Sequence, residues 1–396
     1  MARPALEVAD IFVAHTNSFL AKHGGAVSPA ERRVLHQLTA CRTSLLGGHV
    51  ERCDRCDYER VAYNSCRNRH CPKCQATARA EWLEARARDL LDVEYFHVVF
   101  TVPRPIAQIA LQNKKVMYGI LFKASSETLK TIAADPKHLG AEIGFLSVLH
   151  SWGQSLMHHP HIHCVVPGGG LSPDGSKWIS CPTGFFLPVR VLSKVFRGKF
   201  LELTRQAFAV GDLRFHARLH QLNSAADFEA HLLLTLANDW VVYAKRPFGG
   251  PEQVLKYLAN YTHRVAISNH RLLPMQGDRV RFRWRDYAHG NRKRVMAIDA
   301  VEFIRRFLMH TLPSGFVRIR HSGFLANACR REKLARCRGL LGGDHPVIVE
   351  PEDVNPQETR IPCPKCEHGY LIRFEFDPTS ERQVTRDRCP ALIDSS

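Results

Sequence analysis

The sequence predicts an α+β protein, with a ferredoxin-like antiparallel sheet that carries helices on one face and follows a small helical domain rich in clustered cysteines. Two observations lead to this fold class. Apolar periodicity alternates between strand and helix in the order β-α-β-β-α between residues 94 and 207, and two Cys-x-x-Cys pairs occur before residue 75. The 396 residues exceed what one core usually organises, so more than one domain is expected.

The chain divides where its composition changes. We expect an N-terminal helical and cysteine-rich domain over residues 1–92, a main domain over residues 93–341, and a linker with a C-terminal tail over residues 342–396. The linker is predicted because the chain becomes rich in Pro, Asp and Glu between Gly342 and Gln357.

Two helices are expected at the start of the chain. Apolar residues recur at helical spacing from Leu6 to His23, and Gly24 ends the pattern. The run from Ser28 to Glu31 combines an N-cap serine, a proline at the first helical position and a glutamate three residues after the cap. This capping box predicts the start of a second helix. A third helix is expected from Gln75 to Asp92.

The sheet elements follow in order. Alternating Phe and Val residues predict a strand from Glu94 to Val102, which Pro103 ends. Next come a helix, two strands and a second helix, at 106–134, 143–150, 161–166 and 188–207. This order is typical of a ferredoxin-like sheet. Beyond it we expect amphipathic helices between 213 and 244, a helix that begins at Pro251, and another over 300–311.

The charge of the chain points to a polyanionic partner. Lys and Arg outnumber Asp and Glu by 55 to 38, which gives a formal net charge of +17. A chain this basic binds nucleic acid more readily than neutral ligands. A membrane surface is the competing explanation, but no apolar run reaches the roughly 20 residues that cross a bilayer. The first ten residues lack a secretory signal, so we expect a cytoplasmic protein with reduced cysteines.

The cysteine pairs predict structural zinc. Fourteen residues separate the Cys-x-x-Cys pair that begins at Cys53 from the pair that begins at Cys71. Four thiolates at such a spacing close on one tetrahedral Zn²⁺, so the predicted ligands are Cys53, Cys56, Cys71 and Cys74. Alternative ligands, or members of a second site, are Cys41, His49, Cys66 and His70. Half of a further knuckle, with His368 or Cys389 as candidate partners, is formed by Cys363 and Cys366.

A histidine-rich strand predicts a second kind of metal site. Strand side chains alternate between faces, so His161 and His163 point to one side while Ile162 points into the core. Two imidazoles on one face suit a divalent cation such as Mn²⁺, Zn²⁺ or Fe²⁺. From the spacing alone, polar histidines at the edge of a strand remain the alternative.

A pair of tyrosines and a run of arginines complete the candidates. Tyr257 and Tyr261 lie four residues apart on the helix expected from Pro251, so they share one helix face, and ordinary packing of the two rings remains an alternative. Alternation from 279 to 285 places four arginines on one strand face. A basic hairpin that binds phosphates is expected, with a solvated charged face as the alternative. Its candidate DNA-binding residues are Arg279, Arg281, Arg283, Arg285, Arg292, Lys293 and Arg294.

Four motifs in this order resemble one family. The segments 63–74, 100–103, 159–170 and 257–264 are similar to the rolling-circle transposases of the insertion sequence 91 type. Those are two-tyrosine members of the His-hydrophobe-His nuclease superfamily with an N-terminal zinc-binding domain. The resemblance runs from about Cys41 to Leu341. It departs at the segment 320–323, where the family often has an aromatic residue and this chain has Ser322.

The resemblance implies a function and its site. It implies the His-hydrophobe-His endonuclease fold, and cleavage and rejoining of single-stranded DNA at transposon ends and in target DNA. Tyr257 and Tyr261 would be the nucleophiles, and the attacking tyrosine would become joined to a 5′ phosphate without a nucleotide cofactor. Mg²⁺ or Mn²⁺ would be bound by His161 and His163. Gln154, His159 and His263 are candidates for the third ligand, of which we choose Gln154.

Three other functions remain open at this stage. A zinc-ribbon DNA-binding regulator without catalysis would explain the charge and the cysteines, but not the histidine strand or the tyrosine pair. A replication initiator of the plasmid or phage rolling-circle type would use the same chemistry. A metal hydrolase built on His161 and His163 usually has a nearby downstream Asp or third His, which the segment 164–170 lacks.

Overall fold

In the computed structural model of the protein, the described residues are 4–75, 82, 86–237, 240–248, 253–254, 265–286, 289–342, 361–366, 368–376 and 384–385. Tyr257, Tyr261 and His263 lie outside these ranges. So do most of the helix predicted over 75–92 and most of the helix predicted from Pro251.

A five-stranded antiparallel sheet forms the centre of the protein, in the order β12-β4-β5-β3-β8. Its strands are β3 (Tyr95–Thr101), β4 (Gly144–Trp152), β5 (His158–Pro167), β8 (Val242–Phe248) and β12 (Ile319–Gly323). Without the edge strand β12, the order β4-β5-β3-β8 with helices after β3 and after β5 is the ferredoxin-like one. The predicted fold class is therefore confirmed.

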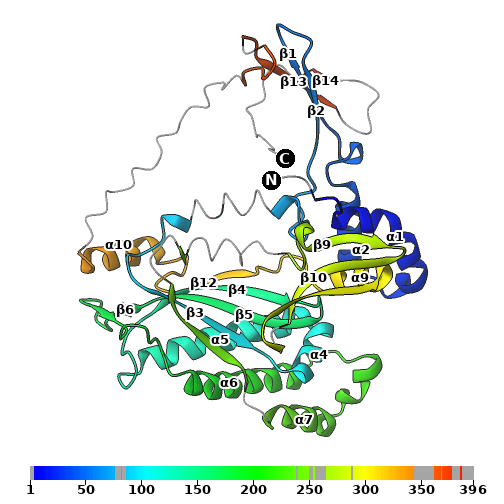
Figure 1. Ribbon diagram of the computed structural model, residues 1–396. Coiled ribbons are helices and arrows are strands. Elements are labelled where there is room, and N and C mark those ends of the chain that lie inside the picture. Colours follow the sequence, from blue (N-terminus) through cyan, green and yellow to red (C-terminus); the bar gives the residue numbers. More distant parts are fainter. Residues whose placement is uncertain are drawn as a thin grey trace.

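Helices cover one face of this sheet, as Figure 1 shows for α5 and α6. They are α4 (Arg104–Gln112), α5 (Lys114–Ala134) and α6 (Val189–Ala209). The covered face buries Phe96 and Phe100 of β3 and Ile162 of β5 against Phe196 of α6. Because strand side chains alternate, the residues between these, such as His97 and His163, lie on the opposite face.

Two elements differ from the sequence prediction. The helix expected over 106–134 is divided at Asn113, whose side chain accepts from Arg214 N at 2.7 Å and donates to Arg214 O at 2.9 Å. An Asn side chain that bonds backbone in this way competes with the helix. The segment expected to be helical over 213–244 contains η3 (Ala217–Asn223), α7 (Ala225–Leu233) and η4 (Leu234–Leu236), and then enters strand β8. The segment Val242–Phe248 becomes strand β8 because it pairs with β3. Its seven residues mix polar and apolar side chains without a clear period, so the sequence does not predict a strand there.

A second sheet, in the order β11-β10-β9, carries the arginine run. Its strands are β9 (Leu272–Gln276), β10 (Arg279–Asp286) and β11 (Arg292–Asp299), preceded by η5 (Asn269–Arg271) and followed by α9 (Ala300–Leu308). Val280 and Phe282 of β10 are fully buried against α9, and the same core includes α1 (Val8–His23) and α2 (Pro29–Ala40). The predicted basic strand and its hairpin with β11 are confirmed, as is the capping box of Ser28 and Glu31.

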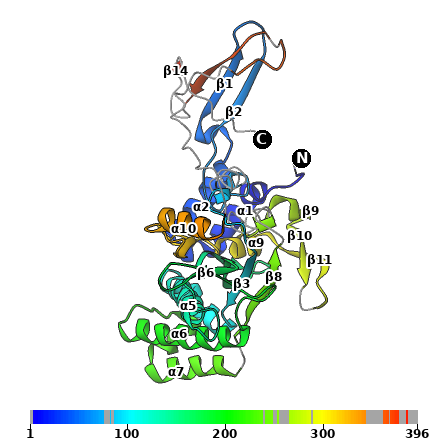
Figure 2. The same cartoon turned by 90° about the vertical axis from the view of Figure 1, so that its left-hand side faces the viewer.

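A third sheet, in the order β14-β13-β1-β2, projects from the body of the protein in Figures 1 and 2. It joins β1 (Gly48–Cys53) and β2 (Glu59–Tyr63) to β13 (Leu371–Phe376) and β14 (Val384–Thr385). The hairpin β1–β2 thus pairs with a segment more than 300 positions later, which sequence periodicity does not predict. The remaining elements are η1 (Gly24–Ala26), η2 (Ser44–Leu46), β6 (Gly169–Leu171), β7 (Trp178–Ser180) and α10 (Arg330–Leu340).

The segment that departs from the family pattern has a structural explanation. Gly323 has φ +61°, and a Cβ built on it would lie 1.7 Å from the carbonyl oxygen of Ile143, so only glycine fits. Arg320 stacks its guanidinium 4.2 Å above the ring of Phe122. Ser322, which is smaller than the aromatic residue of the family, accepts a hydrogen bond at 3.2 Å from Ser126 of α5.

Candidate active site and metal centres

Three imidazoles meet on the face of the five-stranded sheet opposite α4, α5 and α6. The strand register places His150 of β4 directly opposite His161 of β5, and Val148 opposite His163. One ring nitrogen from each of His150, His161 and His163 lies within 4.8 Å of the other two, which fits three ligands of one cation. Sequence reasoning missed His150, although it ends the strand predicted over 143–150. His150 joins the cluster only through the antiparallel pairing of that strand with the His-x-His strand, which no local pattern shows.

Gln154 is the third ligand chosen from the sequence. It lines the same cavity as the three histidines, as does His159. His263 is outside the described residues. The choice of Gln154 therefore stays a prediction, and His150 competes with it.

A hydrogen bond fixes the tautomer of His161, and another orients the ring of His163. Nδ1 of His161 lies 2.7 Å from the carbonyl oxygen of His159, which can only accept, so Nδ1 carries the proton and Nε2 is the nitrogen available to a metal. Nδ1 of His163 lies 2.8 Å from Nε2 of His97, and the two rings stack. If His163 binds a cation through Nε2, its Nδ1–H donates to His97. His97 is thus an orienting residue that the sequence did not reveal.

The histidines form one wall of a cavity of about 1260 Å³ between the five-stranded sheet and the three-stranded sheet β11-β10-β9. The five-stranded sheet contributes Val99, Thr101 and Tyr243 around the cluster, and the side chain of Tyr243 is 52% exposed. We call the sheet β11-β10-β9 the basic sheet. Its strand β10 contributes Trp284, Arg285 and Asp286, and η5, which precedes the sheet, contributes Arg271. A phosphodiester in this cavity would therefore meet both imidazoles and guanidinium groups.

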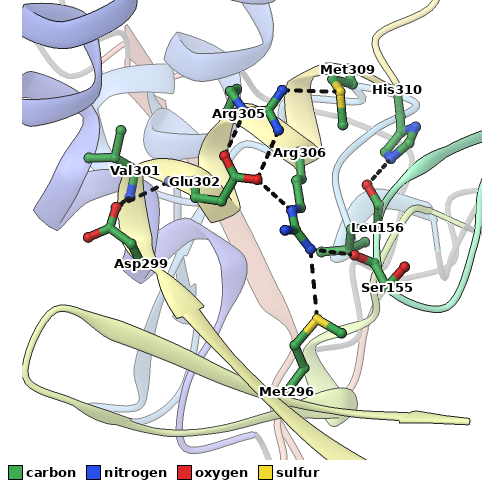
Figure 3. A network of polar contacts seen from close by, with 10 residues as sticks. All are labelled: Ser155, Leu156, Met296, Asp299, Val301, Glu302, Arg305, Arg306, Met309 and His310. Carbon is green, nitrogen blue, oxygen red and sulfur yellow. Dashed lines mark hydrogen bonds and ion pairs between the residues drawn. The ribbon is translucent and has the colours of Figure 1, made fainter. Parts of the chain in front are cut away.

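The turn between β4 and β5 is held from outside by three side chains. The consecutive carbonyl oxygens of Gln154, Ser155 and Leu156 accept hydrogen bonds from Arg271 at 2.6 Å, Arg306 at 3.1 Å and His310 at 3.1 Å. Figure 3 shows the last two, with Glu302 of α9 orienting Arg306 at 2.7 Å. Leu156 is fully buried with φ +61°, a conformation that costs free energy for a residue with a side chain. The turn between β4 and β5 is therefore tied to η5, to α9 and to the residue His310 that follows α9.

Two further histidines, the half-buried His158 and the buried His310, stay neutral near this turn. Nδ1 of His158 donates to the carbonyl oxygen of Ala107 at 3.0 Å, so its Nε2 accepts from the hydroxyl of Tyr118 at 2.8 Å. Burial lowers the pKa of His158 to about 4 and that of His310 to about 3. Neutral rings at physiological pH keep these hydrogen bonds in one arrangement.

The predicted set of four zinc ligands is wrong as one cluster, because the structure divides it. Cys71 and Cys74 lie with two of the alternatives considered above, and together they form the inner quartet, Cys41, Cys66, Cys71 and Cys74. Cys53 and Cys56 lie instead with the C-terminal knuckle and form the outer quartet, Cys53, Cys56, Cys363 and Cys366. The hairpin β1–β2 carries the first pair of cysteines away from the second, which the spacing of four cysteines does not reveal.

The inner quartet has the geometry of a structural zinc site. Its Sγ–Sγ distances of 3.6 Å, between Cys41 and Cys74, Cys66 and Cys74, and Cys41 and Cys71, match the roughly 3.8 Å expected when four sulfurs lie 2.3 Å from one Zn²⁺. Four thiolates leave no open position, so zinc here would stabilise the fold. Next to it, Arg69 donates to the carbonyl oxygens of Phe316 and Pro313 at 2.5 and 2.8 Å, which attaches the quartet to the main domain.

The predicted DNA-binding residues divide between two faces of the basic sheet. The register places Lys293 opposite Arg285, so these two share a face with Arg279, Arg281 and Arg283. Arg292 and Arg294 fall on the other face. Arg294 forms an ion pair of 3.2 Å with the buried carboxylate of Asp286. The first group of five therefore presents the better phosphate-binding surface.

The predicted nucleophiles Tyr257 and Tyr261 lie outside the described residues, as does Tyr287. Among the described tyrosines, Tyr243 lines the histidine cavity. Within the described part of the chain, no helix is both long and apolar enough to cross a membrane.

Comparisons with known proteins agree with this picture. Residues 144–333 match a family described as "Putative transposase", and residues 11–102 match one described as "Transposase zinc-binding domain". The chain is 55% identical to "Putative transposase y4qJ" of Sinorhizobium fredii, over 95% of this chain and 96% of that protein. It is 25% identical to "Transposase for insertion sequence element IS801" of Pseudomonas savastanoi pv. phaseolicola, over 76% and 72% of the two chains.

One solved structure was also matched. It is described as "The structure of TrwC complexed with a 27-mer DNA comprising the recognition hairpin and the cleavage site", with 13% identity and a TM-score of 0.22 over 42% of this chain and 75% of that one. A likeness of this extent carries no weight for the fold, which rests on the strand order described above.

Proposed function

Because this chain belongs to the transposases of the insertion sequence 91 family, we propose that it cleaves and rejoins single-stranded DNA at the ends of its element through a tyrosine joined to a 5′ phosphate. The observation that carries the proposal is the cluster of His150, His161 and His163 in a cavity shared with the basic sheet. A regulator that only binds DNA has no use for three imidazoles held in one place.

His150, His161 and His163 would hold the cation, which would polarise the scissile phosphate and offset the charge that develops there. Three imidazoles suit Mn²⁺ better than Mg²⁺, because Mg²⁺ prefers oxygen ligands. The hydrogen bond from His161 to the carbonyl oxygen of His159 presents Nε2 toward that position. In the same way, the hydrogen bond between His97 and Nδ1 of His163 leaves Nε2 of His163 available to the cation. The chain therefore pre-organises its ligands before DNA arrives.

The attacking group in this proposal is a tyrosine hydroxyl. Its oxygen forms a bond to the phosphorus, its proton is lost, and the bond from phosphorus to the 3′ oxygen breaks, so that oxygen leaves with a proton as a 3′ hydroxyl. The phosphotyrosine retains the energy of the diester, and a second 3′ hydroxyl can reverse the step. Two nucleophiles, Tyr257 and Tyr261, would serve two strand ends in turn.

The basic sheet would bind the strand and deliver it to the cavity. Arg285 belongs to both regions, because it lines the cavity and shares a face with Arg281 and Arg283. Phosphate contacts of this kind set the position of a strand without reading its sequence. A single strand of DNA bound along the face of Arg281 and Arg283 would enter the histidine cavity next to Arg285.

The test is covalent capture of a labelled single-stranded oligonucleotide that carries the element end, in the presence of Mn²⁺. Wild-type protein should form an adduct that survives denaturation, and the double variant Tyr257→Phe/Tyr261→Phe should bind the oligonucleotide but form none. Tyr243→Phe is the matched control, because this tyrosine lines the cavity and should be dispensable. An adduct in the double variant, with loss in Tyr243→Phe, would assign the nucleophile to Tyr243 instead.

A further inference from the structure

The outer quartet joins cysteines from the two ends of the chain. The Sγ atoms of Cys53 and Cys366, 313 positions apart in sequence, lie 3.7 Å from each other, and those of Cys56 and Cys363 also lie 3.7 Å apart. All four sulfurs lie within 4.8 Å of one another. We propose that this quartet binds a second structural Zn²⁺, which holds the C-terminal segment 361–376 against the N-terminal hairpin β1–β2.

The sulfur geometry is that of a tetrahedral site. Separations of 3.7 Å are far longer than the roughly 2.05 Å of a disulfide and match the roughly 3.8 Å between sulfurs around one Zn²⁺. Within each knuckle a backbone N–H points at the first sulfur, from Arg55 to Cys53 and from Lys365 to Cys363, both at 3.4 Å. Such donors stabilise thiolates, which are the form that binds metal. Two knuckles with the same local geometry therefore face one point.

The backbone around the quartet is paired so that the two knuckles stay together. Strands β1 and β13 pair from Gly48 with Phe376 to Cys53 with Leu371. At the knuckles, Asp54 N donates to Tyr370 O at 3.0 Å, and Tyr370 N donates to the Asp54 side chain at 2.8 Å. Lys365 and Asp57 form an exposed ion pair of 2.5 Å between the knuckles. The site is thus built by tertiary pairing and not by one local loop.

Gly369 shows how closely the C-terminal knuckle approaches the hairpin. A Cβ built on Gly369 would lie 2.5 Å from Sγ of Cys53 and 2.7 Å from Oδ1 of Asp54. A side chain at this position would push Cys53 out of the quartet. Gly369 therefore tests the site without removal of any ligand.

Zinc is the cation that this site fits best. Four sulfur ligands in a tetrahedron are typical of Zn²⁺ or of iron, and a closed set leaves no position for substrate. The sheet that carries the quartet is small, with its strand residues mostly half-buried or exposed, so it has little apolar core of its own. Small units of this kind usually depend on a bound metal for stability.

The experiment measures zinc and iron per chain in the full-length protein, purified without chelator. It uses the His161→Ala/His163→Ala background, so that zinc at the imidazoles does not enter the count. Two zinc ions per chain are expected. The pair variants Cys53→Ser/Cys56→Ser and Cys363→Ser/Cys366→Ser should each contain one. The variant with all four substitutions should still contain one zinc ion, because both pairs of cysteines hold the same ion.

Controls separate the outer quartet from the other cysteines. Cys329→Ser and Cys389→Ser should retain two ions, which also tests Cys389 as an alternative partner of the C-terminal knuckle. Cys71→Ser should remove the inner ion and leave the outer one. Gly369→Ala should release the outer ion to a competing chelator at least tenfold faster, whereas Gly339→Ala, whose Cβ would meet nothing within 4 Å, should not.

Two results would overturn the proposal. One is an unchanged zinc content in Cys363→Ser/Cys366→Ser, and the other is additive loss of two ions when both pairs are substituted. Iron in place of zinc would also contradict it. Retention of the inner ion and of oligonucleotide binding shows that the variants are folded. Protease cleavage within 361–376 should become faster in the pair variants while the main domain stays intact.

Discussion

The face of the five-stranded sheet that carries the histidines and the face of the basic sheet that carries Arg281 and Arg283 differ in how their functional side chains are held. His161 and His163 each have a hydrogen bond that orients the ring, and the turn beside them is tied down by Arg271, Arg306 and His310. Arg283 and Lys293, by contrast, are exposed side chains on a strand surface. Chemistry at a phosphate requires fixed atoms, whereas attraction to a polyanion requires only charge. Cleavage and binding should therefore separate on mutation.

The largest expected effect is on the histidine face. His161→Ala or His163→Ala should lower the rate of oligonucleotide cleavage by more than a thousandfold, because each removes an imidazole that positions the cation. Affinity for the uncleaved oligonucleotide should change by less than threefold. Cleavage and binding are measured on the same preparations. Parallel loss of both would show that the strand is structural and would remove the distinction between the two faces.

His97→Ala should have a smaller effect on the same face. It keeps all three clustered histidines but removes the partner of His163 Nδ1, and loss of such an orienting contact typically costs 10- to 100-fold in metal affinity. The concentration of Mn²⁺ that gives half-maximal cleavage should rise by about that factor. Cleavage at saturating Mn²⁺ should recover most of the wild-type rate. A deficit that excess Mn²⁺ does not relieve would show that His97 supports the fold and not the ligand.

Substitutions on the basic sheet should change the affinity for the oligonucleotide and not the rate of the cleavage step. Arg281→Ala and Arg283→Ala should each weaken oligonucleotide binding several-fold and lower the slope of log affinity against log salt by roughly 0.7, the value per lost contact on a single strand. Arg205→Ala is the matched control, because it removes an arginine that pairs with Glu229 on the helical side of the protein. A slope unchanged in Arg281→Ala and Arg283→Ala would place them away from the DNA.

The smallest expected effect is a loss of stability in mild acid. His158 and His310 have folded-state pKa values of about 4 and about 3, below the unfolded value of 6.5, so the unfolded chain binds more protons as the pH falls. The free energy of unfolding that these two neutral histidines contribute is complete above pH 6.5. It is lost on acidification, by up to about 1.4 kcal/mol per pH unit for each group. Urea unfolding at pH 7 and pH 5 measures this, and His310→Gln should show a shallower dependence on pH.

The sequence predicted what local patterns determine. Alternation around Phe96 and Phe100 and around Val280 and Phe282 marked β3 and β10, because each of these pairs lies on one face of its strand and is buried in a core. Spacing placed His161 and His163 on one side, since strand geometry alone decides this. The capping box of Ser28 and Glu31 is likewise local.

What the sequence did not predict depends on pairing between distant segments. His150 joins the histidine cluster only through the register of β4 with β5, and His97 reaches His163 only through the register of β3. The outer quartet requires β1 to pair with β13, so the spacing of Cys53 and Cys71 suggested the wrong partners. β8 was missed for the same reason. A one-dimensional pattern contains no information on which strands become neighbours.

The most direct test of the account compares His150→Ala with Gln154→Ala. Both residues line the cavity, and His150 places a ligand atom within 4.8 Å of those of His161 and His163. Mn²⁺ binding to each variant is measured by electron paramagnetic resonance, together with covalent capture of the oligonucleotide. We expect His150→Ala to lose Mn²⁺ binding by more than 100-fold and to form no adduct, while Gln154→Ala stays within a few-fold of wild type. Loss in Gln154→Ala with retention in His150→Ala would contradict the assignment of the metal site.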